Sequence, residues 1–343
     1  MLKLDFFDIS FRTAYAEAKD LALAQSSVPL LTPGTLQTEI RGGNRFVYRY
    51  RYDAAGKRIT EYLGADQDPE TRIKLAHAEG EIRDAATTSD YSKKLRKLGF
   101  HGTGNSALIT IATLFNAGLF GNGALLVGTH AFGAILNEIG VALGPLAMTE
   151  DVDIARAAPI QIAALPRGGL LRLLAETGLP FFPVPQLDHR EPPTSFKVRG
   201  QRLIVDLLVP SRGEAYQIVP VPEPGAHATG LPHLKYLLED PVRSILLGRD
   251  RIVPVVIPNA GRYCIHKLAV FAMRRGANPK GAKDLNQAAI LAAALAQQDD
   301  FMLTEAIDAA APSLKRLAKA GAKAAITLLG TGYPAAANHL AAL

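Results

Sequence analysis

The sequence predicts an α+β fold, in which a small mixed β-sheet is preceded by an N-terminal helix and hairpin and followed by a C-terminal helical domain. Aromatic and arginine residues alternate with a period of two near residue 50, which is typical of a strand. Short apolar runs between glycine- and proline-rich turns follow, as expected for buried strands. From Tyr263 the chain is rich in alanine, with recurring leucine and isoleucine, which indicates packed helices. We expect three regions, 1–100, 101–215 and 216–343.

Composition limits the class of protein. The chain has 343 residues, 48% of them hydrophobic, and a net charge of +6, which together indicate a globular protein with a preference for anionic partners. Its single cysteine, Cys264, excludes an internal disulfide. Asp5, Asp8 and Arg12 interrupt any signal-peptide core, and the apolar stretches are too short to cross a bilayer. We therefore expect a cytoplasmic protein without a membrane partner.

In the first region, the sequence pattern predicts a helix at Ser10–Gln25, a hairpin in RFVYRYRYDAAGKRITEYLG and a long helix at Pro69–Leu98. We interpret the hairpin as having one packed aromatic face and one solvated basic face, which leaves Arg49 and Arg51 free to meet RNA phosphates. The alternative is an aromatic platform on which nucleic-acid bases stack. The basic run SKKLRKLG is interpreted as a solvated helix end.

The second region alternates helices and strands. The pattern predicts helices at Asn105–Phe120, Thr129–Glu138 and Leu170–Gly178, and strands in GALLVG and MTEDVDIA. A proline-rich connection holds Asp188 and His189, which we interpret as an ordinary surface pair. The segment SFKVRGQRLIVDLLVP then predicts a hairpin that turns at 199–200.

Acidic residues in this region indicate a metal site. Asp151 and Asp153 are two apart on a predicted strand, so both carboxylates point to the same side. Asp206 lies in the middle of an apolar run, where a charged and unpaired group would be costly. Magnesium, which prefers carboxylate and phosphate oxygens, would remove that cost. The alternative for Asp206 is a structural ion pair with Arg199 or Arg202.

A glycine-threonine turn precedes the acidic pair. Gly128 permits close approach to the backbone, Thr129 can cap the following helix, and the free amides of its first turn can hold an anion such as a triphosphate.

The ordered set of Gly128-Thr129, the pair in TEDVDI and Asp206 resembles the DNA polymerase β-like nucleotidyltransferase superfamily. The resemblance implies that Gly128 and Thr129 hold a nucleoside triphosphate and that the three carboxylates bind two Mg²⁺ ions, with Mn²⁺ as a substitute. Nucleoside monophosphate would then pass to a hydroxyl, with release of pyrophosphate.

The resemblance continues from Gly104 to Leu295, where IPNAGRYCIHKLAVFAMRR and KGAKDLNQAAIL look like the helical half of small bacterial nucleotidyltransferases. It aims Lys267 and Lys283 at the phosphates, although from the residues alone we interpret both as solvated helix lysines. It also places the nucleotide in the cleft between the sheet and the helical domain.

The acceptor stays open between tRNA or another RNA, a protein and a small molecule such as an aminoglycoside. A toxin-like enzyme with the same fold is one alternative. A catalytically idle member that binds RNA or a protein partner through Arg49, Arg51 and Lys93–Lys97 is another.

Overall fold

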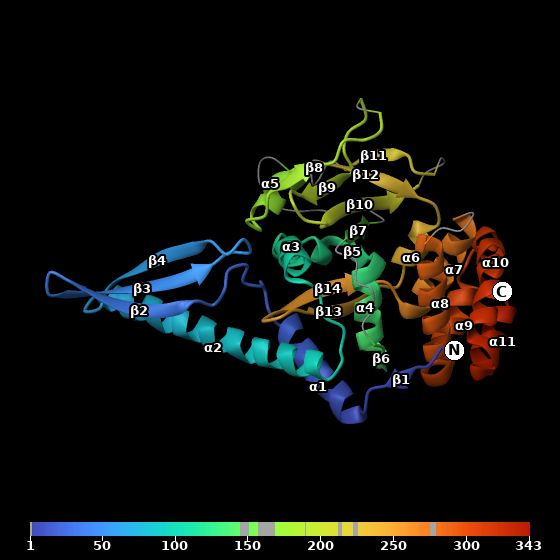
Figure 1. The fold of residues 1–343 in the computed structure, drawn as a ribbon, viewed down its shortest axis with the longest axis horizontal. Coiled ribbons are helices and arrows are strands. Elements are labelled where there is room, and N and C mark those ends of the chain that lie inside the picture. Colours follow the sequence, from blue (N-terminus) through green and yellow to red (C-terminus); the bar gives the residue numbers. More distant parts are fainter. Residues whose placement is uncertain are drawn as a thin grey trace.

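The computed structural model describes most of the chain. The described residues are 2–144, 151–156, 169–188, 190–211, 215–221, 226–274 and 279–343. The fold is α+β, as the sequence predicts, and its parts follow one another along the long axis of the molecule (Figure 1). An N-terminal extension lies at one end, a mixed sheet in the middle and a bundle of helices at the other end.

The central sheet has seven strands in the described part of the chain, in the order β11-β12-β10-β7-β5, with β9 and β8 attached beside β10. The strands are β5 (Ala124–Val127), β7 (Val152–Arg156), β8 (Phe181–Pro183), β9 (Ser195–Val198), β10 (Ile204–Pro210), β11 (Ile218–Val221) and β12 (Ala226–Leu231). β10 runs parallel to β7 and β12, and β5 is antiparallel to β7.

Buried and half-buried side chains alternate along the central strand of the sheet. Along β10, Val205, Leu207 and Val209 are buried while the residues between them are only half-buried. The hairpin at 199–200 is present as β9 and β10. The start of MTEDVDIA, before Asp151, lies outside the described residues. Because β11 and β12 join the same sheet, this sheet continues past the expected boundary after residue 215.

Three helices accompany the sheet: α3 (Asn105–Asn116), α4 (Gly128–Glu138) and α5 (Gly169–Ala175). Their apolar side chains share one large core with the strands and with the C-terminal bundle. Helix α4 follows β5 without a loop and packs against β7. This direct strand-to-helix passage places its first turn at the edge of β7.

A second hairpin, β13 (Val242–Leu247) and β14 (Ile252–Ile257), escaped the sequence analysis. It follows the short helix α6 (Leu234–Leu238). It packs on α3, α4 and β5 on one side, and on α1 (Ile9–Leu23) and α2 (Pro69–Lys97) of the extension on the other. A small pair, β1 (Asp5–Phe6) with β6 (Val141–Ala142), adds a further link between the N-terminus and the centre.

The C-terminal bundle consists of α7 (Ala260–Met273), α8 (Pro279–Gln298), α9 (Asp300–Asp308), α10 (Pro312–Leu329) and α11 (Pro334–Ala341). Small residues let these helices touch at their backbones. A Cβ on Gly261 would lie 2.4 Å from the carbonyl oxygen of Met302, and one on Gly321 would lie 2.3 Å from that of Leu268. The alanine-rich composition is thus explained by close packing. Among the described residues, no helix combines the length and apolar character that crossing a membrane requires.

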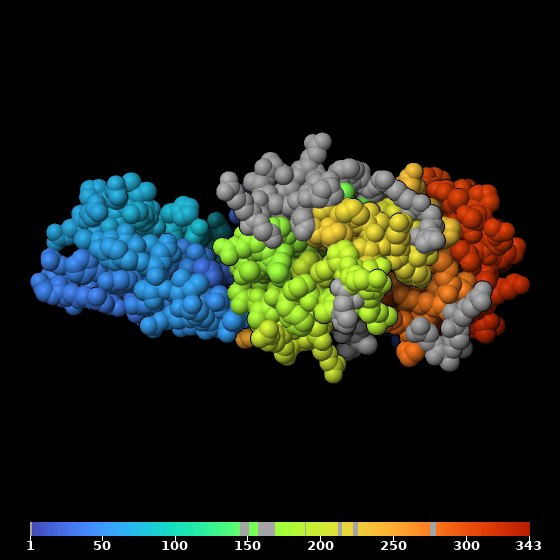
Figure 2. Space-filling model, turned by 90° about the horizontal axis from the view of Figure 1, so that it is seen from above, coloured from blue at the N-terminus to red at the C-terminus, as the bar shows by residue number. Residues whose placement is uncertain are grey.

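The extension contains α1 (Ile9–Leu23), a three-stranded sheet and α2 (Pro69–Lys97). The predicted hairpin is β3 (Asn44–Tyr52) with β4 (Arg58–Ala65), and β2 (Thr35–Arg41) adds an unpredicted third strand. Helix α2 covers one face of this sheet and forms a small core with Val47 and Leu63. The sheet projects beyond the body of the molecule (Figure 2).

The prediction of a solvated basic face on this sheet is wrong. Arg49 is only 3% exposed, pairs with Glu81 of α2 at 2.5 Å and donates to the carbonyl of Pro33. Arg51 donates to the carbonyl of Thr32. The arginine face is therefore packed and the aromatic face is open. The alternation along a strand shows which side chains share a face, but it does not show which of the two faces packs against a helix. Here an arginine can be buried because the carboxylate of Glu81 pairs with it.

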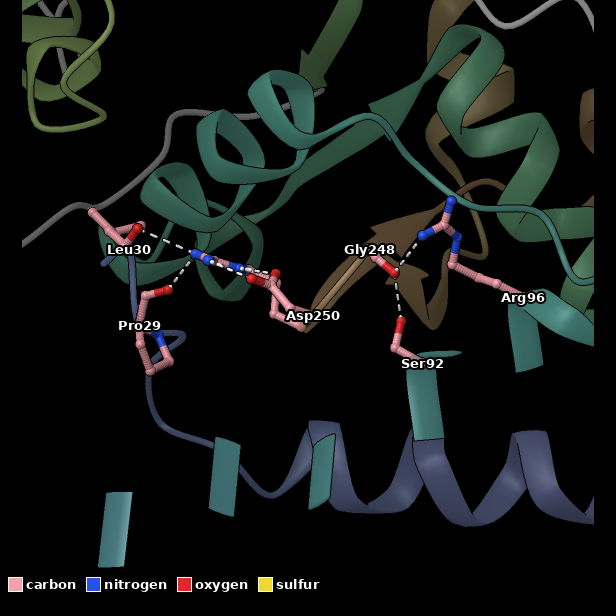
Figure 3. Close-up of polar contacts among 7 residues, drawn as sticks. Pro29, Leu30, Ser92, Arg96, Gly248 and Asp250 are labelled. Carbon is pink, nitrogen blue, oxygen red and sulfur yellow. Dashed lines mark hydrogen bonds and ion pairs between the residues drawn. The ribbon is translucent and has the colours of Figure 1, made fainter. Parts of the chain in front are cut away.

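The extension is held to the β13–β14 turn by hydrogen bonds to backbone carbonyls (Figure 3). Ser92 and Arg96 of α2 both donate to the carbonyl of Gly248, at 2.7 and 3.2 Å. Arg251 reaches back in the other direction and donates to the carbonyls of residues 29–30 at 2.8 and 3.2 Å. Gly248 is buried, so its carbonyl would be costly to leave without these donors, and the bonds position the extension on the hairpin.

Candidate active site

Two carboxylates meet at the centre of the sheet. Asp153 of β7 is paired directly with Asp206 of β10, and the two strands are parallel. Paired residues of neighbouring strands point to the same face and lie about 5 Å apart at their Cα atoms. Asp151 immediately precedes β7 and is two residues from Asp153. The structure therefore brings all three predicted carboxylates to one face of the sheet.

Like charges in a buried place resist ionisation. Burial, and then the neighbouring charge of Asp206, raise the pKa of Asp153 to about 7. The pKa of Asp206 is also raised, first by burial, although a hydrogen bond from Ser195 opposes the rise. This site favours a cation between its carboxylates.

The partner of Asp206 is Ser195, its neighbour across β9 and β10, whose hydroxyl donates to the carboxylate. Among the described residues, neither Arg199 nor Arg202 forms an ion pair with it. The simple structural explanation for this acid, an arginine partner across the hairpin, does not hold.

Gly128 is fitted to Asp153. Its φ is +70°, and a Cβ at this position would lie 2.0 Å from a carboxylate oxygen of Asp153. β5 and β7 are paired at Val127 and Asp153, which brings the start of α4 against this carboxylate. A side chain here would have to displace Asp153, so the glycine is required for the close approach.

Thr129 does not cap α4, contrary to the prediction. The helix begins at Gly128, its N-cap is Val127, and it has no side-chain cap. The Thr129 hydroxyl instead accepts a hydrogen bond of 2.6 Å from Lys283 of α8. Burial lowers the pKa of Lys283 and the neighbouring Lys267 lowers it further. The β5–α4 turn is thus tied to the helical bundle by a cation.

Lys267 is not a solvated lysine. Its side chain is 15% exposed and pairs at 2.6 Å with Asp284, a carboxylate that is only 3% exposed. Arg274 pairs with the other oxygen of Asp284. Two cations therefore share one buried acid, which orients them on the face of α7 turned toward Asp153 and leaves an excess of positive charge there.

A cavity lies between the sheet and the bundle, where the sequence analysis placed a nucleotide. It encloses about 770 Å³ including its open mouth. Gly128, Asp153, Lys267 and Arg274 line its polar side. The remaining wall is mostly apolar and includes Leu208, Leu231, Leu234, Leu237, Val270 and Met273. A cavity with a charged end and an apolar slot suits a ligand with the same division.

His266 also lines this cavity, one position before Lys267. It is 7% exposed, and neither ring nitrogen has a hydrogen-bond partner among the described residues. Burial lowers its pKa to about 3, so the ring is neutral. Buried polar atoms without partners are rare in folded proteins, and a ligand in the cavity would reach these nitrogens only after a rotation of the ring.

The donor set fits magnesium bound together with a phosphate ligand. Within the described part of the chain, no three His, Cys, Asp or Glu side chains form a ready-made metal cluster. Magnesium commonly uses one or two carboxylates and completes its shell with waters and substrate phosphates. The raised pKa of Asp153 shows that its carboxylate has an uncompensated cost that a cation would remove.

Several site residues were not singled out from the sequence. Ser195, Tyr263, His266 and Asp284 have ordinary sequence surroundings and reach the site only through tertiary contacts. Tyr263 donates to the carbonyl of Gly128 at 2.8 Å and so supports the turn beside Asp153. The one usable signal was Asp284, the single acid of helix α8, beside Lys283. His189 lies outside the described residues, and Asp188 pairs with Arg190 on the surface.

Carboxylates on paired strands, a glycine turn against them and cations across a cleft are the arrangement expected of a site for phosphate-containing ligands. The sequence model of a family described as Nucleotidyltransferase matches residues 107–312, which is more than half of the chain. The chain therefore belongs to this nucleotidyltransferase family, and it is a transferase of nucleotidyl groups. No curated protein and no solved structure matches it significantly.

Replacing Gly128 by alanine should abolish function without unfolding the protein. The new Cβ would meet the Asp153 carboxylate at 2.0 Å and displace it. The matched control is Gly123→Ala, because Gly123 also has a positive φ of +92° but has open space around its Cβ. Each change should cost about 1–2 kcal/mol of unfolding free energy from backbone strain. Only Gly128→Ala should lose nucleotide binding in a calorimetric titration, and equal binding by both variants would contradict the role of the close approach.

The stability of the metal-free protein should fall as the pH rises through about 7. The folded state holds the Asp153 proton with a pKa near 7, against 3.8 ordinarily, so its contribution to stability is complete below about pH 4 and is lost above pH 7. Thermal unfolding in EDTA, compared between wild type and Asp153→Asn, isolates this contribution. The variant should lose less stability than the wild type as the pH rises from about 4 to 7. Parallel pH curves for the two proteins would count against a buried, repelled carboxylate.

Proposed function

We propose that this nucleotidyltransferase uses two Mg²⁺ ions to transfer a nucleoside monophosphate from a nucleoside triphosphate to the hydroxyl of an acceptor, which is an RNA, a protein or a small molecule, with release of pyrophosphate. The observation that carries the proposal is the pairing of Asp153 with Asp206 beside the Gly128 turn and opposite Lys267. A triphosphate complexed with magnesium supplies both the cations that the carboxylates favour and the anion that the lysines favour.

In this proposal Asp151 and Asp153 hold both ions, and Asp206 holds the ion on the acceptor side. When bound, the ions stabilise the attacking and leaving oxygens of an in-line displacement. The acceptor oxygen bonds to the α-phosphorus, its proton passes to water, and the bond from the α-phosphorus to the bridging oxygen breaks as pyrophosphate leaves.

The residues across the cleft position the triphosphate. The amides at the start of α4 face an anion at the positive end of the helix. Lys267 and Lys283 are held in place by Asp284 and Thr129, so their charges are oriented before the nucleotide binds. Such preorganisation lowers the entropy cost of closing the site around the phosphates.

The nucleoside fits the apolar part of the cavity. The leucines of β10, β12 and α6 provide a surface for a flat base, and His266 offers one donor and one acceptor to its edge. A base contact at His266 would satisfy nitrogens that otherwise have no partner among the described residues.

The alternative of an idle fold that binds RNA through Arg49 and Arg51 loses its main support. Arg49 is buried against Glu81 and Arg51 is half-buried on the packed face of the sheet. Three acids on one face of a sheet are costly to keep without a cation, which favours a working site over an idle one.

Magnesium-dependent nucleotide binding tests the proposal. Wild type and the double variant Asp151→Ala/Asp153→Ala should be titrated calorimetrically with all four nucleoside triphosphates, with and without Mg²⁺. Wild type should bind at least one nucleotide only with magnesium, and the double variant should bind at least a hundred-fold more weakly. Asp188→Ala, which removes a surface carboxylate paired with Arg190, is the control. Equal binding by the wild type and the double variant, or binding indifferent to magnesium, would refute the proposed site.

His266→Phe should change base preference and preserve magnesium dependence. The ring volume remains, while one or two hydrogen bonds to the base, each ~0.5–1.5 kcal/mol, are lost. The ratio of affinities for the preferred and the poorest nucleotide should fall about five- to ten-fold. The control is His101→Phe, which alters a histidine with a buried nitrogen outside the cavity. An unchanged ratio would remove His266 from the base contact.

A further inference from the structure

The extension carries an open aromatic surface that the nucleotidyl-transfer site does not use. We define the aromatic face as Phe46, Tyr48, Tyr50 and Tyr52 of β3 with Tyr62 of β4. Tyr52 and Tyr62 are 44% and 55% exposed, and the other three are half-buried among themselves. The opposite face of the sheet already provides the core with α2. The aromatic side chains are therefore not part of the core between the sheet and α2.

Arginines accompany the rings. Arg41 of β2 lies over the Tyr48 ring at 5.5 Å, and Arg58 of β4 lies over the Tyr50 ring at 5.1 Å. Glu39 is the acid on this face, and it accepts hydrogen bonds from both Arg41 and Tyr50 at 2.6 Å. Because Arg41 neutralises Glu39, the second arginine leaves the aromatic face with a net positive charge. The guanidinium groups of both arginines lie over the tyrosine rings.

We propose that the aromatic face binds single-stranded RNA by stacking its bases on Tyr48 and Tyr62 while Arg41 and Arg58 contact its phosphates. Exposed aromatic side chains on a β-sheet, flanked by cations, are the surface on which single-stranded RNA is commonly held. The alternative occupant is a protein, because tyrosine and arginine are also enriched at protein–protein interfaces.

The tyrosine hydroxyls favour RNA over DNA. Tyrosine hydroxyls both donate and accept hydrogen bonds, as the ribose 2′-hydroxyl does. Thr60 and Gln37 add further polar groups on the same face, opposite Tyr50 and Tyr48 of β3. The inference gives the proposed reaction an acceptor class, but it does not depend on that reaction, because stacking needs neither magnesium nor nucleotide.

The surface lies outside the part of the chain that the family shares. The family match begins at residue 107, whereas the aromatic face lies between residues 46 and 62. The three-stranded sheet that carries the aromatic face lies at one end of the long axis of the molecule, and the central sheet lies in the middle (Figure 1). An RNA held on this face must therefore extend along the molecule to place a hydroxyl at Asp206.

Binding of a fluorescent single-stranded RNA, measured by anisotropy in EDTA without nucleotide, tests the proposal on the full chain. Tyr48→Leu/Tyr62→Leu keeps apolar side chains on the strands but removes the flat rings. Its affinity should fall at least about thirty-fold, because each lost ring removes the stacking of one base. Arg58→Gln should weaken binding and flatten its dependence on salt.

The control is Phe301→Leu, which removes a 66% exposed aromatic ring from α9 and should leave RNA binding unchanged. Since the chain has no tryptophan, its emission comes from tyrosine, and RNA should quench it in wild type more than in the double variant. Magnesium-dependent nucleotide binding by the double variant should stay intact, which separates this surface from the active site. Absence of RNA binding by wild type, equal binding by the double variant, or equal affinity for DNA of the same sequence would overturn the proposal. A co-purifying protein released by the double variant would also overturn it.

Discussion

The arrangement of the site depends on one electrostatic constraint, the burial of two like charges at directly paired positions of neighbouring parallel strands. Asp153 and Asp206 cannot move apart, because the ladder between β7 and β10 sets their separation. Their repulsion explains why the surrounding groups are cations and hydroxyls. Ser195 donates to one acid, while Lys267 and Lys283 lower the pKa that burial raises on the other. The same constraint requires a glycine at residue 128, since the neighbouring turn has no room for a side chain.

The cationic side chains across the cleft are held in fixed positions by hydrogen bonds and ion pairs. Lysine has a long flexible side chain, and a free lysine would lose much rotamer entropy on meeting a phosphate. Here Asp284 holds Lys267 and Arg274 together, and Thr129 holds Lys283. Most of that entropy is therefore lost during folding. The bundle and the sheet stabilise each other electrostatically, because the bundle places cations beside the carboxylates of the sheet.

Much of the fold and part of the site could be predicted from the sequence. The period of two identified β3, an apolar run beside a turn identified β10, and the lone acid in that run identified Asp206. The family match supports the nucleotidyltransferase assignment that these residues suggested. Periodicity could not show which face of β3 is buried, because Arg49 enters the interior only with Glu81, thirty-two residues away. It also could not identify Asp284 or His266, whose importance comes from contacts between distant helices and strands. The hairpin of β13 and β14 was missed because its valines and isoleucines also suit a buried helix segment.

The β13–β14 turn has a consequence for how the molecule comes apart. Helix α3 packs on one side of this hairpin and the extension on the other, and a Cβ on Gly248 would lie 2.1 Å from Leu108 of α3. The same glycine accepts hydrogen bonds from Ser92 and Arg96. Neither neighbour can detach without exposing the apolar strands between them. The extension and the central region should therefore unfold in one cooperative transition, and a protease that cuts the folded chain would not release a stable extension from an intact remainder.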